Sequence, residues 1–104
     1  MEVRARLWLE RKGRFVMGSG RAELLRLVRE TGSIAKAAEA MGMSYSHAWS
    51  QIREMSAAAG GKVVETSRGG RTGGCSRLTP LGIEYLERYQ KERERLGRHL
   101  SARP

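Results

Sequence analysis

The stretch from Thr31 to Met55 constrains the fold more than any other part of the sequence, because it holds two helix starts separated by one glycine. Ser33 precedes an alanine-rich run, and its hydroxyl can accept hydrogen bonds from the first turn of a helix. Gly42 can take the left-handed conformation that ends a helix, and Ser44 offers a second N-cap two residues later. The sequence therefore predicts two short helices joined by a tight turn.

The apolar residues of both predicted helices repeat at intervals of three to four residues, which gives each helix one buried face. These residues are Ile34, Ala37, Ala38 and Met41 in the first helix and Ala48, Ile52, Met55 and Ala59 in the second. Small alanine side chains allow two helices to approach closely at a steep crossing, as a helix-turn-helix requires. Helical hairpins with a glycine turn also occur in proteins that never touch nucleic acid, so this stretch alone leaves DNA binding open.

The polar positions of the second helix are candidates for reading DNA bases, because the second helix of a helix-turn-helix places its N-terminal turns in the major groove. These positions are Ser46, His47, Ser50 and Gln51. Ser44 and Tyr45 stand at the helix start, where hydroxyls and backbone N–H groups commonly contact phosphate. Trp49 is expected to pack against the core.

The composition indicates an anionic partner. The 104 residues carry a formal net charge of +9 with a pI near 10.8, which suits DNA but also RNA or a membrane surface.

The sequence shows no long apolar run and no leader, so we expect a soluble, cytoplasmic protein of one domain without a membrane partner. Cys75 is the only cysteine, which excludes an intrachain disulfide and a zinc cluster. We expect it to be an inert, partly covered thiol, and a redox switch is the alternative. No catalytic set has credible spacing, so neither an enzyme nor a cofactor is expected.

The N-terminal residues 1–17 are predicted to form a β-hairpin. Apolar and polar side chains alternate over residues 3–9, as in a half-buried strand, and residues 15–17 can return as a second strand. Trp8 falls on the arginine-bearing face, where it stacks with Arg4 or Arg6, meets a second subunit or is covered by its own chain. A helix over residues 21–31 should then supply core residues to the helix-turn-helix at residues 33–59, namely Leu24, Leu25, Leu27 and Val28.

Residues 62–78 are predicted to form a wing, in which two short strands flank a loop rich in glycine and arginine. Such a loop can lie close to a DNA backbone or enter a minor groove. A nucleotide-binding glycine loop is the alternative, but neither a G-x-G-x-x-G motif nor a P-loop lysine is present between a buried strand and a helix. Over residues 60–80, Lys62 and three arginines outweigh Glu65, so we expect the wing and the N-terminal hairpin to supply most of the electrostatic affinity.

A long helix is predicted over residues 80–100, capped by Thr79 and starting at Pro80. Its apolar stripe is narrow and consists of Tyr85, Leu86, Tyr89, Leu96 and Leu100. A thin stripe on a helix that extends past a small core suits a partner helix, and a second copy of the chain is the expected partner. The alternative is a solvated tail that frays after Tyr89.

Three phrases of the sequence resemble the N-terminal DNA-binding domain of the ModE-type, molybdate-responsive transcriptional regulators. They are E-T-G-S-I-A-K-A-A-E-A-M-G-M-S-Y-S-H-A-W, V-V-E-T-S-R-G-G-R-T-G-G and S-R-L-T-P-L-G. The L-T-P-x-G step is also similar to LysR-type regulators. The resemblance implies a winged helix-turn-helix that binds operator DNA as a homodimer, with binding roles for Ser44, Tyr45, Ser46 and residues 69–74, and with Trp49 beside the buried face.

Two departures from the ModE pattern limit what the resemblance implies. The family commonly has a lysine after the serine-tyrosine pair, where this chain has Ser46 followed by His47. The molybdate-binding domain of full-length members is not among these residues, and although Ser101, Ala102 and Arg103 resemble the opening of its oxyanion-binding motif, Pro104 departs from it. Molybdate or another oxyanion is therefore not expected to bind this chain.

Taken together, the sequence predicts an α+β, mainly helical fold, a winged helix-turn-helix with an N-terminal β-hairpin and a long C-terminal dimerisation helix. The predicted function is sequence-specific binding of a pseudo-palindromic DNA operator by a homodimeric transcriptional regulator. A winged-helix protein-interaction module and a non-specific architectural DNA binder are the alternatives. Trp8, Tyr85, Tyr89, Leu96 and Leu100 are the candidate dimer contacts. The candidate DNA contacts are Ser33, Lys36, Ser44, Tyr45, Ser46, His47, Ser50, Gln51, Arg53, Arg68, Gly69, Gly70, Arg71, Thr72, Gly73, Gly74 and Arg77.

Overall fold

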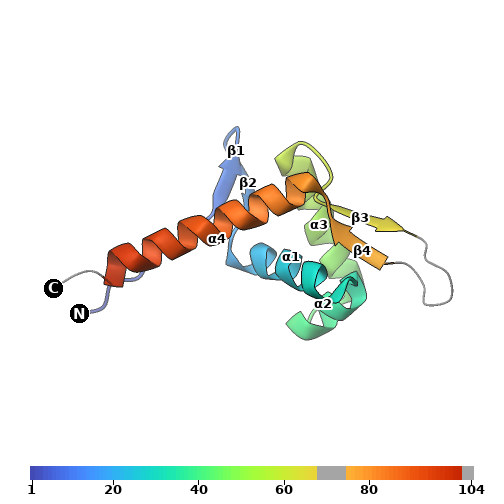
Figure 1. Ribbon diagram of the computed structural model, residues 1–104, viewed down its shortest axis with the longest axis horizontal. Helices are drawn as coiled ribbons and strands as arrows, with labels where there is room; N and C mark the ends of the chain where they lie inside the picture. The colour runs from blue at the N-terminus through green and yellow to red at the C-terminus, as the bar shows by residue number, and fades with distance from the viewer. Residues whose placement is uncertain (68–74, 102–104) are drawn as a thin grey trace.

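The computed structural model describes residues 1–67 and 75–101, which form four helices and two antiparallel hairpins (Figure 1). The predicted fold class is confirmed. In chain order the elements are β1 (Leu9–Arg11), β2 (Arg14–Met17), α1 (Ser19–Thr31), α2 (Ile34–Met41), α3 (Tyr45–Ala59), β3 (Val64–Ser67), β4 (Cys75–Leu78) and α4 (Pro80–Ser101). Strand β1 pairs with β2, and β3 pairs with β4.

The turn between α2 and α3 has the capping groups that the sequence predicts. Gly42 adopts a left-handed conformation with φ of 68°, and its N–H donates to the carbonyls of Ala38 and Glu39. Ser44 then caps α3, because its Oγ accepts a hydrogen bond from the His47 N–H at 3.1 Å. The two helices therefore begin and end where their local sequence directs them.

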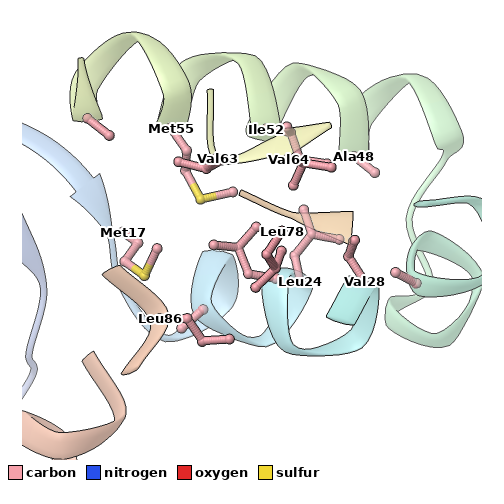
Figure 2. Packing of buried hydrophobic residues seen from close by; sticks show 14 of the residues in the cluster. Met17, Leu24, Val28, Ala48, Ile52, Met55, Val63, Val64, Leu78 and Leu86 are labelled. Atoms are coloured by element: carbon pink, nitrogen blue, oxygen red, sulfur yellow. The ribbon is translucent and has the colours of Figure 1, made fainter. Parts of the chain in front are cut away.

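The core lies between α1 and α3 and is closed at one end by α4 and β2 (Figure 2). Leu24 and Val28 of α1 face Ile52 and Met55 of α3, and all four side chains are buried. The other buried side chains shown in Figure 2 complete the same cluster, including Met17 of β2, Val64 and Leu78 of the wing strands and Leu86 of α4. Burial of this cluster fixes the position of α3 on the rest of the domain.

The wing strands are attached to the helices by backbone hydrogen bonds. The N–H of Ser76 in β4 donates to the carbonyl of Gly32, which follows α1, at 2.8 Å. Thr79 caps α4 as predicted, since its Oγ1 accepts from the Gly82 N–H at 3.0 Å. The same hydroxyl donates to the carbonyl of Lys62 at 2.6 Å. Both ends of the wing are thus fixed to the body of the domain.

The predicted strand over residues 3–9 is wrong, because β1 begins only at Leu9 and residues 1–8 form no regular secondary structure. The partner strand β2 ends at Met17, opposite Leu9, and α1 starts at Ser19. A hairpin extends only as far as both of its strands, so residues 3–8 have no strand to pair with. Val3, the first apolar residue of that alternation, is 53% exposed.

Within the described ranges, no helix combines the length and the apolar character that crossing a membrane requires.

Candidate nucleic-acid interface

Helix α3 presents one polar face away from the core. Ala48, Ile52 and Met55 point into the core, whereas Ser46, His47 and Arg53 are exposed and Ser50 is half-buried. The helical repeat of 3.6 residues places Ser46, Ser50 and Arg53 together on the side opposite the buried residues. These small or flexible side chains leave the surface of α3 accessible along its first three turns.

Ser33 and Ser44 were both predicted as DNA contacts, and in the structure both hydroxyls cap helices. The Oγ of Ser33 accepts from the Lys36 N–H at 3.1 Å, and the Oγ of Ser44 accepts from the His47 N–H at the same distance. The Oγ atoms of Ser44 and Ser46 lie 3.5 Å apart. A capping hydroxyl keeps its own proton, so it can still donate to a phosphate oxygen.

Gln51 differs from the other predicted base readers because its side-chain carbonyl already has a partner. Nε of Arg21 donates to Oε1 of Gln51 at 2.8 Å. The same guanidinium donates to the Val16 carbonyl at 3.0 Å and pairs with Glu54 at 2.6 Å. The side chain of Arg21 is only 15% exposed. Gln51 is therefore held at the edge of α3 toward α1, and its amide NH₂ group and the second lone pair of Oε1 remain for a base edge.

Sequence reasoning missed Arg21. Nothing in the local sequence marks it, since its hydrogen-bond partners on α3 lie 30 and 33 positions away. The arginine also stacks on the ring of Phe15, with Cζ 4.9 Å from the ring centroid. Arg21 thus joins α1, β2 and α3 through one planar group.

The wing strands carry one of the predicted phosphate contacts within the described residues. Nε of Arg77 donates to Oε1 of Glu65 on the opposite strand at 2.7 Å, and the arginine side chain is 78% exposed. The remaining predicted contacts of the wing, Arg68, Gly69, Gly70, Arg71, Thr72, Gly73 and Gly74, lie outside the described residues. The Arg77 pair is an exposed one, which contributes little stability and can be exchanged for a phosphate.

Cys75 is exposed, and the prediction that its thiol is partly covered is wrong. Its Sγ lies 3.1 Å from Oγ of Ser67, its partner in the strand register. The side chain points to solvent because alternate positions of β4, Ser76 and Leu78, fill the buried face. In the part of the chain that the structure describes, no three His, Cys, Asp or Glu side chains gather into a group that could hold a metal ion.

The predicted dimer contacts on α4 separate into two sets. Tyr89 is only 2% exposed, so its ring belongs to the core of its own chain and is removed from the candidate interface. Together with Leu86 it lies on the face of α4 that meets α1. Tyr85, Leu96 and Leu100 are half-buried. Trp8 is 49% exposed, and its Nε1 donates to Glu10 at 2.8 Å.

Comparison with known proteins identifies the family of this fold. Residues 20–83 match the family described as bacterial regulatory helix-turn-helix protein, lysR family. The molybdenum-pterin-binding protein MopB of Rhodobacter capsulatus is 40% identical over 81 residues, which are 78% of this chain and 30% of MopB. The DNA-binding transcriptional dual regulator ModE of Escherichia coli K12 is 32% identical over 89 residues, 86% of this chain and 34% of that protein.

The chain spans about a third of the length of these curated relatives. The match over residues 20–83 covers α1, the helix-turn-helix, the wing strands and the start of α4. This chain therefore belongs to the lysR family of bacterial regulatory helix-turn-helix proteins, as a winged helix-turn-helix domain of the ModE type.

Proposed function

We propose that this chain is a sequence-specific, double-stranded DNA-binding transcriptional regulator that acts as a homodimer. Helix α3 would enter the major groove, and the wing would follow the backbone or the minor groove. The polar outer face of α3 carries this proposal, because Ser46, Ser50 and Arg53 make no contribution to the buried core. An α-helix with short polar side chains on its outer face fits a major groove, which is about 12 Å wide.

The charge of the chain supports an anionic partner for this face. The formal net charge of +9 favours association with phosphates at long range. Lys36 of α2 and Arg53 of α3 are exposed, and both add positive charge to the surface of the helix-turn-helix. Arg11, by contrast, lies beside Gly60 at the C-terminal end of α3, where a cation is favourable for the helix dipole. We therefore expect less phosphate contact from the β1–β2 hairpin than from the wing.

The long helix α4 supports a homodimer. Its C-terminal half extends beyond the other helices (Figure 1). Half-buried Leu96 lines a groove of about 750 Å³ together with the exposed rings of Trp8 and Phe15. A second copy of α4 would cover these three apolar side chains, and a two-fold axis would then present two α3 helices to successive major grooves, roughly 34 Å apart.

The test is selection of binding sites from random duplex DNA at roughly physiological salt. Enrichment of an inverted repeat would support a dimeric, sequence-specific regulator and would give the half-site spacing. Salt-sensitive binding without enrichment would indicate an architectural DNA binder instead. Absence of binding would favour a protein-interaction module.

Two variants would test the division of roles between α3 and the wing. We expect Arg71→Ala to weaken binding to all sequences and to reduce the slope of log K against log salt by about 1. Ser50→Ala should instead change the preferred bases and leave the salt slope unchanged. Arg29→Ala is the matched control, because it removes the same charge from an exposed side chain of α1 with only a 3.4 Å pair to Glu87.

A further inference from the structure

A shallow aromatic groove lies on the exposed surface of α3. Tyr45, Ser46, Trp49 and Arg53 line it, and its volume is about 310 Å³. All four residues come from the first nine positions of α3, the part that a helix-turn-helix directs at DNA. The groove is thus located where base edges would be read.

The two rings of the groove form a preformed apolar surface. The centroids of Tyr45 and Trp49 are 6.3 Å apart, and the ring planes meet at 77°, which is an edge-to-face arrangement. Trp49 is half-buried and packs against the core, whereas Tyr45 is 55% exposed. The core therefore holds the tryptophan, and the tyrosine ring lies edge-to-face against it. A ligand that contacts this surface meets a tryptophan that is already ordered, which reduces the conformational entropy lost on binding.

The polar members of the groove indicate a nucleic acid and not an apolar peptide. Arg53 adds a guanidinium and Ser46 a hydroxyl at its rim, and both side chains are exposed. Within residues 1–67 and 75–101, no carboxylate forms an ion pair with Arg53. A cation beside aromatic rings, on a chain of charge +9, is complementary to an apolar group that is flanked by phosphates.

We propose that the Tyr45–Trp49 groove recognises the 5-methyl group of a thymine in the operator. This inference rests on the proposed function, because it assigns one base to the same helix. The thymine methyl is the distinctive apolar group that a base pair presents in the major groove. In the groove the methyl contacts the tyrosine and tryptophan rings, the Ser46 hydroxyl can donate to the thymine O4, and Arg53 contacts the adjoining backbone or a purine edge.

The experiment replaces each thymine of the selected operator with deoxyuridine, one position at a time, and measures Kd. This change removes one methyl group and leaves the Watson–Crick pairing intact. We expect one thymine in each half-site to show a roughly fourfold rise in Kd, the value of one buried methyl group, while the other positions change little.

Two variants assign the effect to the aromatic groove. Tyr45→Ala should discriminate thymine from deoxyuridine less than the wild type does, because only the Trp49 ring is left in the groove, whereas Tyr45→Phe should keep the full discrimination because the ring remains. Thermal unfolding of both variants serves as a folding control, since Tyr45 is exposed.

The outcomes separate this inference from the proposed function. If an operator is enriched but no thymine responds to deoxyuridine, the inference is overturned and the proposed function stands. Discrimination of wild-type strength in Tyr45→Ala, or its loss in Tyr45→Phe, also overturns it, because the contact would then lie elsewhere or depend on the phenol hydroxyl. If no sequence is enriched, the proposed function fails and the inference fails with it.

Discussion

Gly82, in the first turn of α4, lies directly against the backbone of Val63, and a β-carbon at position 82 would overlap the Val63 carbonyl oxygen. That oxygen also accepts a hydrogen bond from the Thr79 N–H at 3.0 Å. The close approach brings the start of α4 onto the segment that leads into the wing. Backbone atoms cannot move aside as a flexible side chain can, so this position tolerates only glycine.

Gly82→Ala should therefore destabilise the chain by about 2 kcal/mol or more, because the new methyl group forces α4 away from Val63. Gly97 is a matched control on the same helix, since a β-carbon there meets no atom within 4 Å. Gly97→Ala should stabilise the chain by roughly 0.5–1 kcal/mol through helix propensity. Urea unfolding measures the free energy of unfolding of both variants. If both variants were destabilised, or both stabilised, the packing described at Gly82 would be contradicted.

Ser44→Ala should lower stability by about 1 kcal/mol, because the His47 N–H loses its capping oxygen. Ser44→Gly should lower the free energy of unfolding by only about a few tenths of a kcal/mol, since glycine is tolerated at an N-cap. The glycine variant therefore separates capping from DNA binding. We expect it to bind the operator several-fold more weakly than wild type in a gel-shift titration, and unchanged affinity would show that the hydroxyl serves the helix alone.

Arg21→Met should destabilise the chain by roughly 1–3 kcal/mol, because the Val16 carbonyl and Gln51 lose a shared donor in a largely buried place. Arg21→Lys should recover only part of this loss, since an ammonium lacks the planar fork of the guanidinium. Arg29→Met is the control, as its pair with Glu87 is exposed and 3.4 Å long, so its effect should be close to zero. Equal unfolding midpoints for the Arg21 and Arg29 variants would disprove the special role of Arg21.

The capped helix-turn-helix could be predicted because its signals are local. The Ser33 and Ser44 hydroxyls each bond a backbone N–H three residues later, and Gly42 bonds carbonyls within the last turn of α2. Such contacts depend on residues that are neighbours in the sequence. The buried faces of α2 and α3 follow from the same short-range periodicity.

The features that were missed depend on contacts between distant segments. The alternation before Leu9 resembles a strand, but the early start of α1 at Ser19 removes the residues that would pair with it. The apolar stripe of α4 predicts Tyr89 as a dimer contact, because periodicity defines a stripe without naming its partner, and in the structure Tyr89 is buried in the core of its own chain. The contact of Arg21 with Gln51 likewise requires the packing of α1 on α3.

Glu23 should show a pKa below the ordinary glutamate range, chiefly because Arg26 donates hydrogen bonds to its carboxylate, while partial burial opposes the shift. A carboxyl group whose pKa is lowered on folding stabilises the fold above its unfolded pKa, and this stabilisation is lost as the pH falls through the folded pKa. NMR titration of the Glu23 side chain should show the pKa rising in Arg26→Gln. Because the pair is exposed, added salt should reduce the shift in the wild type, and a shift insensitive to both changes would exclude Arg26 as its cause.

Leu100→Glu should weaken the proposed homodimer at least about tenfold, because a carboxylate would have to be desolvated in an apolar contact between two α4 helices. Arg98→Gln is the matched control, since it also changes the net charge by about one unit and lies on the opposite side of the helix, exposed to solvent. Sedimentation equilibrium of both variants measures the change, and gel shifts on one half-site show whether α3 still binds. We expect Leu100→Glu to keep its affinity for a single half-site while losing cooperative binding to the inverted repeat. If the dimer dissociation constant of Leu100→Glu equalled that of the wild type, the interface would lie away from the C-terminal half of α4.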